Sequence, residues 1–146
     1  MLAKEIQCSI NMLLEAHGLP LDSPYVVLAG SAMYFYGMRA TVRDIDIYVP
    51  DLPVDHDEKF YGKLEVDAKP HWNMWPSEEL LRDSTVIHGV RVMDLKSILR
   101  MKKMMNRPKD QTDIKLLEAR IGERVSHRTE IVYKWANENK ESQSQE

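Results

Sequence analysis

The sequence has almost no cysteine and no long apolar run. Its single cysteine, Cys8, cannot form a disulfide within the chain, which is typical of proteins kept in a reducing compartment. No apolar stretch approaches the roughly 20 residues that a membrane-spanning helix needs. The first residues, MLAKEIQCSINMLLEAHG, lack the small-residue cleavage site of a signal peptide. We therefore expect a cytoplasmic protein with no membrane partner.

Positive charge is not in excess either. The 20 Lys and Arg residues are outnumbered by 23 Asp and Glu residues, so the formal net charge is −3 at pH 7. Proteins that hold nucleic acid mainly through its phosphates are usually basic, and non-specific nucleic-acid binding is therefore disfavoured. A small or transiently held nucleic-acid substrate is compatible with this charge.

Length and hydrophobic periodicity predict one small α+β domain, with helices packed on a small mixed β-sheet. We assign residues 1–140 to this domain and residues 141–146, ESQSQE, to a disordered polar tail. A first helix is expected to end at Gly18, and helices are expected from residue 94 onward. A short helix at 31–37 is expected to have Ser31 as its N-cap. Residues 50–62 are polar and read as irregular, and the predicted strands are 25–30, 43–49, 63–69 and a pair of strands, or one bent strand, around His88-Gly89.

Two aspartates stand one residue apart inside the predicted strand RDIDIYV. Residues two apart on a strand point to the same side, so Asp44 and Asp46 share one face. Carboxylates held side by side repel each other, and a divalent cation such as Mg²⁺ or Mn²⁺ resolves that repulsion. Asp67 on a later strand can supply a third carboxylate, and Glu65 shares its face. The alternative is a solvated strand face that holds no metal.

Gly30 and Ser31 follow an apolar strand and precede a helix. The free N–H groups and the positive end of the dipole at a helix N-terminus favour phosphate binding. The absence of a side chain at Gly30 lets a phosphate approach the backbone. Taken alone, such a turn is weak evidence for a site. Its combination with the aspartate pair is more specific.

These residues resemble the signature of the polymerase-beta-type nucleotidyltransferase superfamily. That signature is Gly-Ser, about a dozen residues, Asp-x-Asp, and an acidic residue on a later strand; here it matches Gly30-Ser31, Asp44-Ile45-Asp46 and Asp67. The stretch GMRATVRDIDIYV is most like the small bacterial and phage members, which include abortive-infection toxins and antibiotic nucleotidyltransferases. The segment DLKSILRMKKMMNRPKDQTDIKLL is similar to their post-sheet region, so the resemblance covers roughly residues 25–118.

The resemblance implies the nucleotidyltransferase fold and a magnesium-dependent transfer of a nucleoside monophosphate from a nucleoside triphosphate to a hydroxyl acceptor. Asp44, Asp46 and Asp67 would be both metal ligands and catalytic residues, with Glu65 as the alternative third acid. Gly30 and Ser31 would bind the β- and γ-phosphates. The acceptor, whether a small molecule, a tRNA end or a protein side chain, is left open, as is the base.

Three cationic residues are further candidates for nucleotide binding: Arg39, Arg43 and Lys102. The two arginines flank the aspartate strand, and the alternative for each is a surface charge. Lys102 falls on the apolar stripe of its helix, so an ion pair with Asp110 or Asp113 competes with a phosphate contact. The acidic loop VDHDEKF reads as solvated rather than as a second metal site. His71, Trp72 and Trp75 either stack on a base or an acceptor or pack over the sheet edge.

Two classes of function remain. The first is a minimal nucleotidyltransferase, whose pocket a homodimer or a partner protein could complete. The second is a non-catalytic module that keeps the fold and binds a nucleotide or a protein. The presence of Gly30, Ser31, Asp44, Asp46 and a third acid favours the enzyme, because unneeded charges in a site are costly.

Overall fold

The computed structural model describes residues 2–72 and 75–122. The predicted final helix and the tail, residues 123–146, lie outside this range. In chain order the elements are α1 (Leu2–Ala16), β1 (Val26–Val27), α2 (Ala29–Phe35), β2 (Asp44–Tyr48), β3 (Asp57–Tyr61), β4 (Leu64–Lys69), α3 (Ser77–Arg82), β5 (Ser84–Ile87), β6 (Val90–Met93), α4 (Leu95–Met105) and the 3-10 helix η1 (Pro108–Asp110), after which residues 111–122 are helical.

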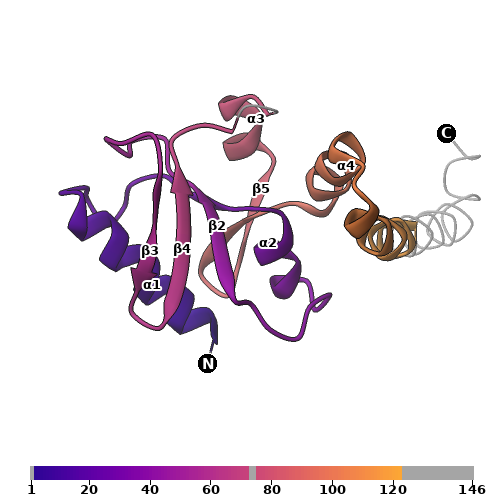
Figure 1. The fold of residues 1–146 in the computed structure, drawn as a ribbon, viewed down its shortest axis with the longest axis horizontal. Coiled ribbons are helices and arrows are strands. Elements are labelled where there is room, and N and C mark those ends of the chain that lie inside the picture. Colours follow the sequence, from indigo (N-terminus) through magenta and orange to yellow (C-terminus); the bar gives the residue numbers. More distant parts are fainter. Residues whose placement is uncertain (1, 73–74, 123–146) are drawn as a thin grey trace, which may run out of the picture.

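The strands form one six-stranded sheet in the order β3-β4-β2-β1-β6-β5 (Figure 1). β2 pairs in parallel with β4, and β1 pairs in parallel with β6, while the other neighbours are antiparallel. The sheet is therefore mixed, and the predicted α+β class is confirmed. None of the helices in the described part of the chain has the length and apolarity needed to cross a bilayer.

α1 covers one face of the sheet because its apolar stripe matches the apolar side of the central strands. Ile6, Ile10, Leu13 and Leu14 are fully buried in the core that also contains Ile45 and Ile47 of β2. Two polar contacts fix α1 on the edge strand β3: the Ser9 hydroxyl donates to the Tyr61 carbonyl at 2.6 Å, and His17 Nε2 lies 2.6 Å from an Asp57 carboxylate oxygen. The acidic residues of β2 alternate with its isoleucines and thus face the opposite side.

The opposite face is only partly covered. α2 contacts β2 and β6, so it lies over the centre of the sheet, and α4 packs against α2. In Figure 1 they stand on the side of β2 that is away from β4 and β3. The β2–β4 part of this face stays open, and the acidic residues lie on that part.

Two sequence predictions about local structure are corrected, and one open alternative is decided. The first strand is Val26–Val27 rather than 25–30, because helix α2 already begins at Ala29. Residues 50–62 are not all irregular, since they contain the edge strand β3. Of the two alternatives around His88-Gly89, the pair of strands is confirmed: β5 and β6 form a hairpin whose two turn residues have φ angles of 52° and 80°, as a tight hairpin turn requires.

Candidate active site

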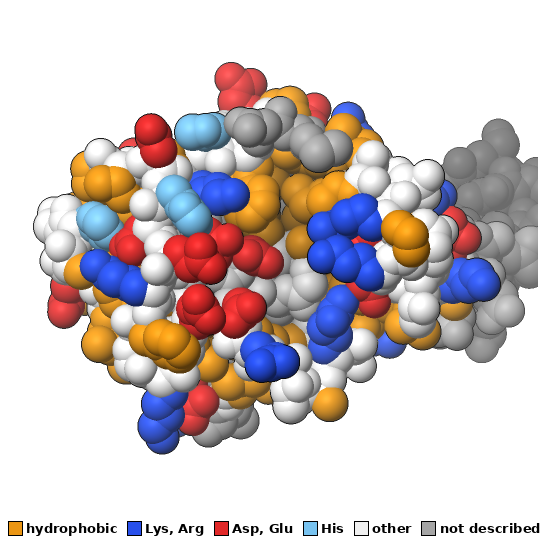
Figure 2. Space-filling model, in the orientation of Figure 1, with side chains coloured by type: hydrophobic (Ala, Val, Ile, Leu, Met, Phe, Trp, Pro, Cys, Tyr) orange, Lys and Arg blue, Asp and Glu red, His pale blue; other side chains and the backbone are white. Residues whose placement is uncertain are grey.

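A cleft of about 1060 Å³ opens between the acidic face of the sheet and helix α4. All eight site residues proposed from the sequence line it: Gly30, Ser31, Arg39, Arg43, Asp44, Asp46, Asp67 and Lys102. Figure 2 shows carboxylates gathered over β2 and β4, facing lysine and arginine side chains on the α4 side across a hollow. The cleft therefore has one acidic wall and one basic wall.

The parallel register of β2 and β4 builds the acidic wall. Asp46 is aligned with Asp67, and Asp44 is aligned with Glu65. Neighbouring residues in register point to the same side of a sheet, so four carboxylates share the open face. Asp67 lines the cleft and Glu65 does not, which favours Asp67 as the third acid.

Asp46 is the most perturbed carboxyl of this wall. Burial, followed by the charges of Asp67 and Asp44, raises the pKa of Asp46 to about 6, although Lys69 and Lys102 oppose the rise. Desolvation and the charge of Asp44 also raise the pKa of the Glu65 carboxyl. The wall therefore repels its own negative charge, and a bound cation would relieve that repulsion.

Ser31 connects α2 to the aspartate strand, and the prediction that it caps the helix is wrong. It lies inside the first turn of α2, where Leu28 is the N-cap residue. The Ser31 hydroxyl donates to the Asp44 carbonyl at 2.8 Å and accepts from the Asp46 amide at 3.0 Å. The serine thus fixes the backbone of both aspartates relative to the start of α2.

The side of Gly30 on which a side chain would stand faces the Arg39 guanidinium. A Cβ atom at Gly30 would stand 3.7 Å from the Arg39 guanidinium carbon, so a small side chain would contact that group without a clash. Ala29 just before it has a φ of 44°, in the left-handed region that non-glycine residues rarely adopt. The chain therefore turns sharply into α2 at the cleft.

The basic wall is held by a network of ion pairs. Lys102 is 6% exposed, and its ammonium group lies 3.1 Å from an Asp113 oxygen and 3.4 Å from an Asp110 oxygen. Arg39 contacts Asp113 at 2.6 Å. Arg107 donates to both carboxylate oxygens of the fully buried Asp110 and holds the pKa of that carboxyl well below its usual range. The predicted ion pairs of Lys102 are present, and Lys102 also lines the cleft.

The sequence interpretation assigned His56 to a solvated loop, but the structure places it beside the acidic wall. His56 Nε2 lies 2.5 Å from an Asp67 oxygen and 3.7 Å from a Glu58 oxygen. The three side chains are close enough to hold a metal ion. Alternation along β3 places Glu58 beside Asp67, but the pairing of β3 with β4 had to be known before this signal could be used.

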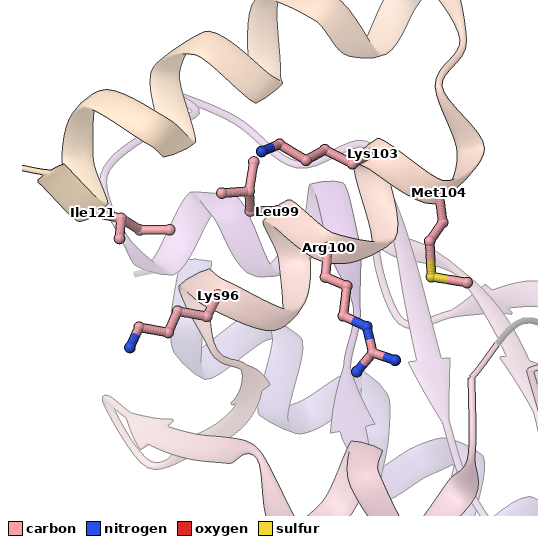
Figure 3. A pocket seen from close by; sticks show the side chains of 6 residues that line it. All are labelled: Lys96, Leu99, Arg100, Lys103, Met104 and Ile121. Carbon is pink, nitrogen blue, oxygen red and sulfur yellow. The ribbon is translucent and has the colours of Figure 1, made fainter.

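A second hollow, of about 530 Å³, lies along α4 away from the aspartates. Figure 3 shows its side chains: five come from α4, namely Lys96, Leu99, Arg100, Lys103 and Met104, and the sixth is Ile121. It shares no residue with the cleft, and its lining has no hydroxyl, thiol or carboxylate side chain. The chemistry of the described residues is therefore concentrated in the cleft.

No protein-family model and no curated protein matches the chain. Among solved structures, the chain is similar to the crystal structure of JHP933 from Helicobacter pylori, with 18% sequence identity and a TM-score of 0.43. The similarity covers 68% of this chain and 53% of that one, so this chain spans about half the length of JHP933. At this TM-score the likeness carries no inference about activity.

Proposed function

We propose that the protein is a metal-dependent nucleotidyltransferase, which moves a nucleoside monophosphate from a nucleoside triphosphate to a hydroxyl acceptor. One observation carries the proposal. Three carboxylates, those of Asp44, Asp46 and Asp67, lie on one open sheet face at a cleft whose other wall is cationic. This is the charge distribution that a metal-bound triphosphate needs.

The carboxylates suit magnesium or manganese. The donor set on the sheet face is made of oxygen atoms, which hard divalent cations prefer. Burial raises the pKa of Asp46, and the negative charges of Asp67 and Asp44 add to the rise. In the proposed enzyme, Asp44 and Asp46 would hold two cations, and Asp67 would ligate one of them. When bound, the cations stabilise the charge on the entering and leaving oxygens.

The phosphates would lie between the start of α2 and the basic wall. Backbone N–H groups in the first turn of a helix have no partner within the helix, so those of Gly30 and Ser31 are suited to donate hydrogen bonds to phosphate oxygens. Arg39, Arg43 and Lys102 supply positive charge around the same space. Arg39 and Lys102 share Asp113 as partner, which holds both cations at the cleft.

The reaction needs little from the protein beyond position and charge. The acceptor oxygen forms a bond to the α-phosphorus, and the bond from that phosphorus to the oxygen bridging to the β-phosphate breaks. Pyrophosphate leaves with the bonding electron pair. Asp67 orients the acceptor hydroxyl and takes its proton.

One observation favours the alternative, a module that binds a nucleotide without turnover. Arg39 and Lys102, two of the cations assigned to the triphosphate, already have carboxylate partners. Such pairs stabilise the protein without any ligand. Binding and turnover must therefore be measured separately.

The test combines both measurements. The wild type and an Asp44→Asn/Asp46→Asn variant are incubated with each α-labelled ribonucleoside triphosphate and Mg²⁺, together with tRNA, a protein extract or hydroxyl-bearing antibiotics. We expect label on one acceptor class with the wild type only, and a metal-dependent rise in melting temperature that the variant lacks. A rise without label on any acceptor would favour the binding module. Neither effect in the wild type would contradict both.

A further inference from the structure

The loop that follows β4 places two tryptophans at the cleft. β4 carries Asp67 and ends at Lys69, and Trp72 and Trp75 come directly after it. Both indoles line the cleft together with the carboxylates. Trp72 and Trp75 also form an isolated antiparallel bridge with each other, which fixes their spacing.

Both indoles have an unsatisfied hydrogen-bond donor. Among the described residues, the buried side-chain polar atoms without a partner are Trp72 Nε1 and Trp75 Nε1. Trp75 is only 4% exposed, so its donor is shielded from water. Buried donors are almost always paired in native structures, so an unpaired indole N–H indicates a hydrogen-bond acceptor that is supplied by a ligand. Here the two unpaired indole N–H groups belong to residues that line the proposed ligand site.

A cationic side chain also lies over the ring of each indole. The Lys69 ammonium lies 4.8 Å from the centre of the Trp72 ring, and the Arg100 guanidinium lies 4.6 Å from the centre of the Trp75 ring. These contacts hold the rings in place, and Lys69 also adds positive charge to the lining of the cleft. A rigid aromatic surface with hydrogen-bond donors and nearby cations matches a planar heterocycle attached to a phosphorylated sugar.

We propose that Trp72 and Trp75 form the subsite for the base of the nucleotide. Trp72, which is partly exposed, stacks on the base, and the Trp75 N–H donates to a carbonyl or ring-nitrogen acceptor at the edge of the base. This inference rests on the proposed function, because it assumes that the triphosphate binds at Gly30 and Ser31. It adds to that function the part of the cleft that distinguishes a nucleotide from a bare triphosphate.

The comparison of nucleoside triphosphates with inorganic tripolyphosphate tests the subsite. Both ligands are titrated with Mg²⁺ into the full chain by calorimetry. Base stacking on an aromatic side chain predicts that the preferred nucleoside triphosphate binds about tenfold more tightly than tripolyphosphate. Trp72→Leu should remove that difference and leave tripolyphosphate binding unchanged. Trp75→Phe, which keeps the ring and loses the donor, should remove part of it.

Phe60→Leu is the matched control, because Phe60 is 68% exposed and does not line the cleft. It should change neither affinity. Tryptophan fluorescence in a Trp135→Phe background, which retains only Trp72 and Trp75, should be quenched by the nucleotide and not by tripolyphosphate.

The outcomes separate the two proposals. If all four nucleoside triphosphates bind no more tightly than tripolyphosphate, or if Trp72→Leu weakens both ligands equally, the base subsite is wrong and the triphosphate site stands. If neither ligand binds, the proposed function fails and the subsite fails with it.

Discussion

At the scale of single residues, the cleft combines carboxylates that repel one another with cations that are already paired. Asp46 is aligned with Asp67 and has a raised pKa, whereas Asp110 opposite is fully buried and has a lowered one. The acidic wall therefore costs stability without a ligand, and the basic wall contributes stability. Substitutions on the two walls should have opposite effects on folding.

Asp46→Asn should stabilise the ligand-free protein near pH 7.5. The pKa of Asp46 rises from 3.8 in the unfolded chain to about 6 in the folded one. The protonated Asp46 carboxyl therefore adds to the unfolding free energy in full below pH 3.8, and this stabilisation is lost as pH rises through 6. We expect the variant to gain about 1–2 kcal/mol in unfolding free energy at pH 7.5, and less at pH 5. Urea unfolding at the two pH values measures the gain. Asp51→Asn, at an exposed loop position, is the control and should change neither value.

Lys102→Met should destabilise the protein. Removing one partner of a buried ion pair leaves the other charge uncompensated, and Lys102 serves both Asp110 and Asp113. Arg107 still pairs with Asp110, so we expect a loss of about 2–3 kcal/mol rather than the full cost. Lys103→Met, whose exposed ion pair with Glu118 spans 3.0 Å, should cost no more than about 1 kcal/mol. Equal losses in the two variants would show that Lys102 has no structural role.

At the scale of elements, the site depends on how α2 is joined to β2. The Ser31 hydroxyl makes two hydrogen bonds to the backbone of the aspartate strand. Those contacts hold the first turn of α2 beside Asp44 and Asp46. The junction therefore sets the distance between the proposed phosphate site and the proposed metal ligands.

Ser31→Ala should lower both stability and nucleotide binding. The loss of two buried hydrogen bonds predicts about 1–3 kcal/mol less unfolding free energy, because the Asp46 amide loses its partner. We also expect a smaller metal-dependent thermal shift with nucleoside triphosphates. Ser23→Ala removes another buried serine, whose hydroxyl donates to the Pro20 carbonyl at 2.6 Å and which does not line the cleft. A thermal shift reduced equally in both variants would mean that Ser31 acts only through stability.

The sequence predicts the elements that carry their own periodicity and misses those that depend on distant partners. The aspartate strand was predicted at 43–49 and is Asp44–Tyr48, because alternation alone defines it. β3 was missed because Asp57 lies buried at its start. That aspartate is tolerated because His17 and Tyr61 hydrogen-bond to it, which no local pattern reveals.

In the candidate site too, some features follow from local sequence and others depend on distant partners. The shared face of Asp44 and Asp46 could be read from their spacing. The closeness of Asp67 depends on the β2–β4 register, and the His56 contact depends on the pairing of β3 with β4. The link from Arg39 through Asp113 to Lys102 joins three separate segments. Such a link follows from the packing of helices and not from any one stretch of sequence.

At the scale of the whole molecule, one sheet supports both the core and the proposed chemistry. α1 seals the Ile45–Ile47 face, and the incomplete cover on the other face leaves the carboxylates open to a ligand. The central claim is that these carboxylates bind divalent cations together with a triphosphate. Metal binding can be measured without knowledge of the acceptor.

The most direct test counts bound Mn²⁺ by electron paramagnetic resonance, with and without a non-hydrolysable nucleoside triphosphate analogue. The wild type should bind two Mn²⁺ ions per chain in the presence of the analogue, and Asp44→Asn/Asp46→Asn should bind none at this site. Binding should strengthen between pH 5 and pH 7, because protons compete for Asp46, whose pKa is about 6. Equal Mn²⁺ binding by the wild type and the variant, or no analogue-dependent binding by either, would contradict the account.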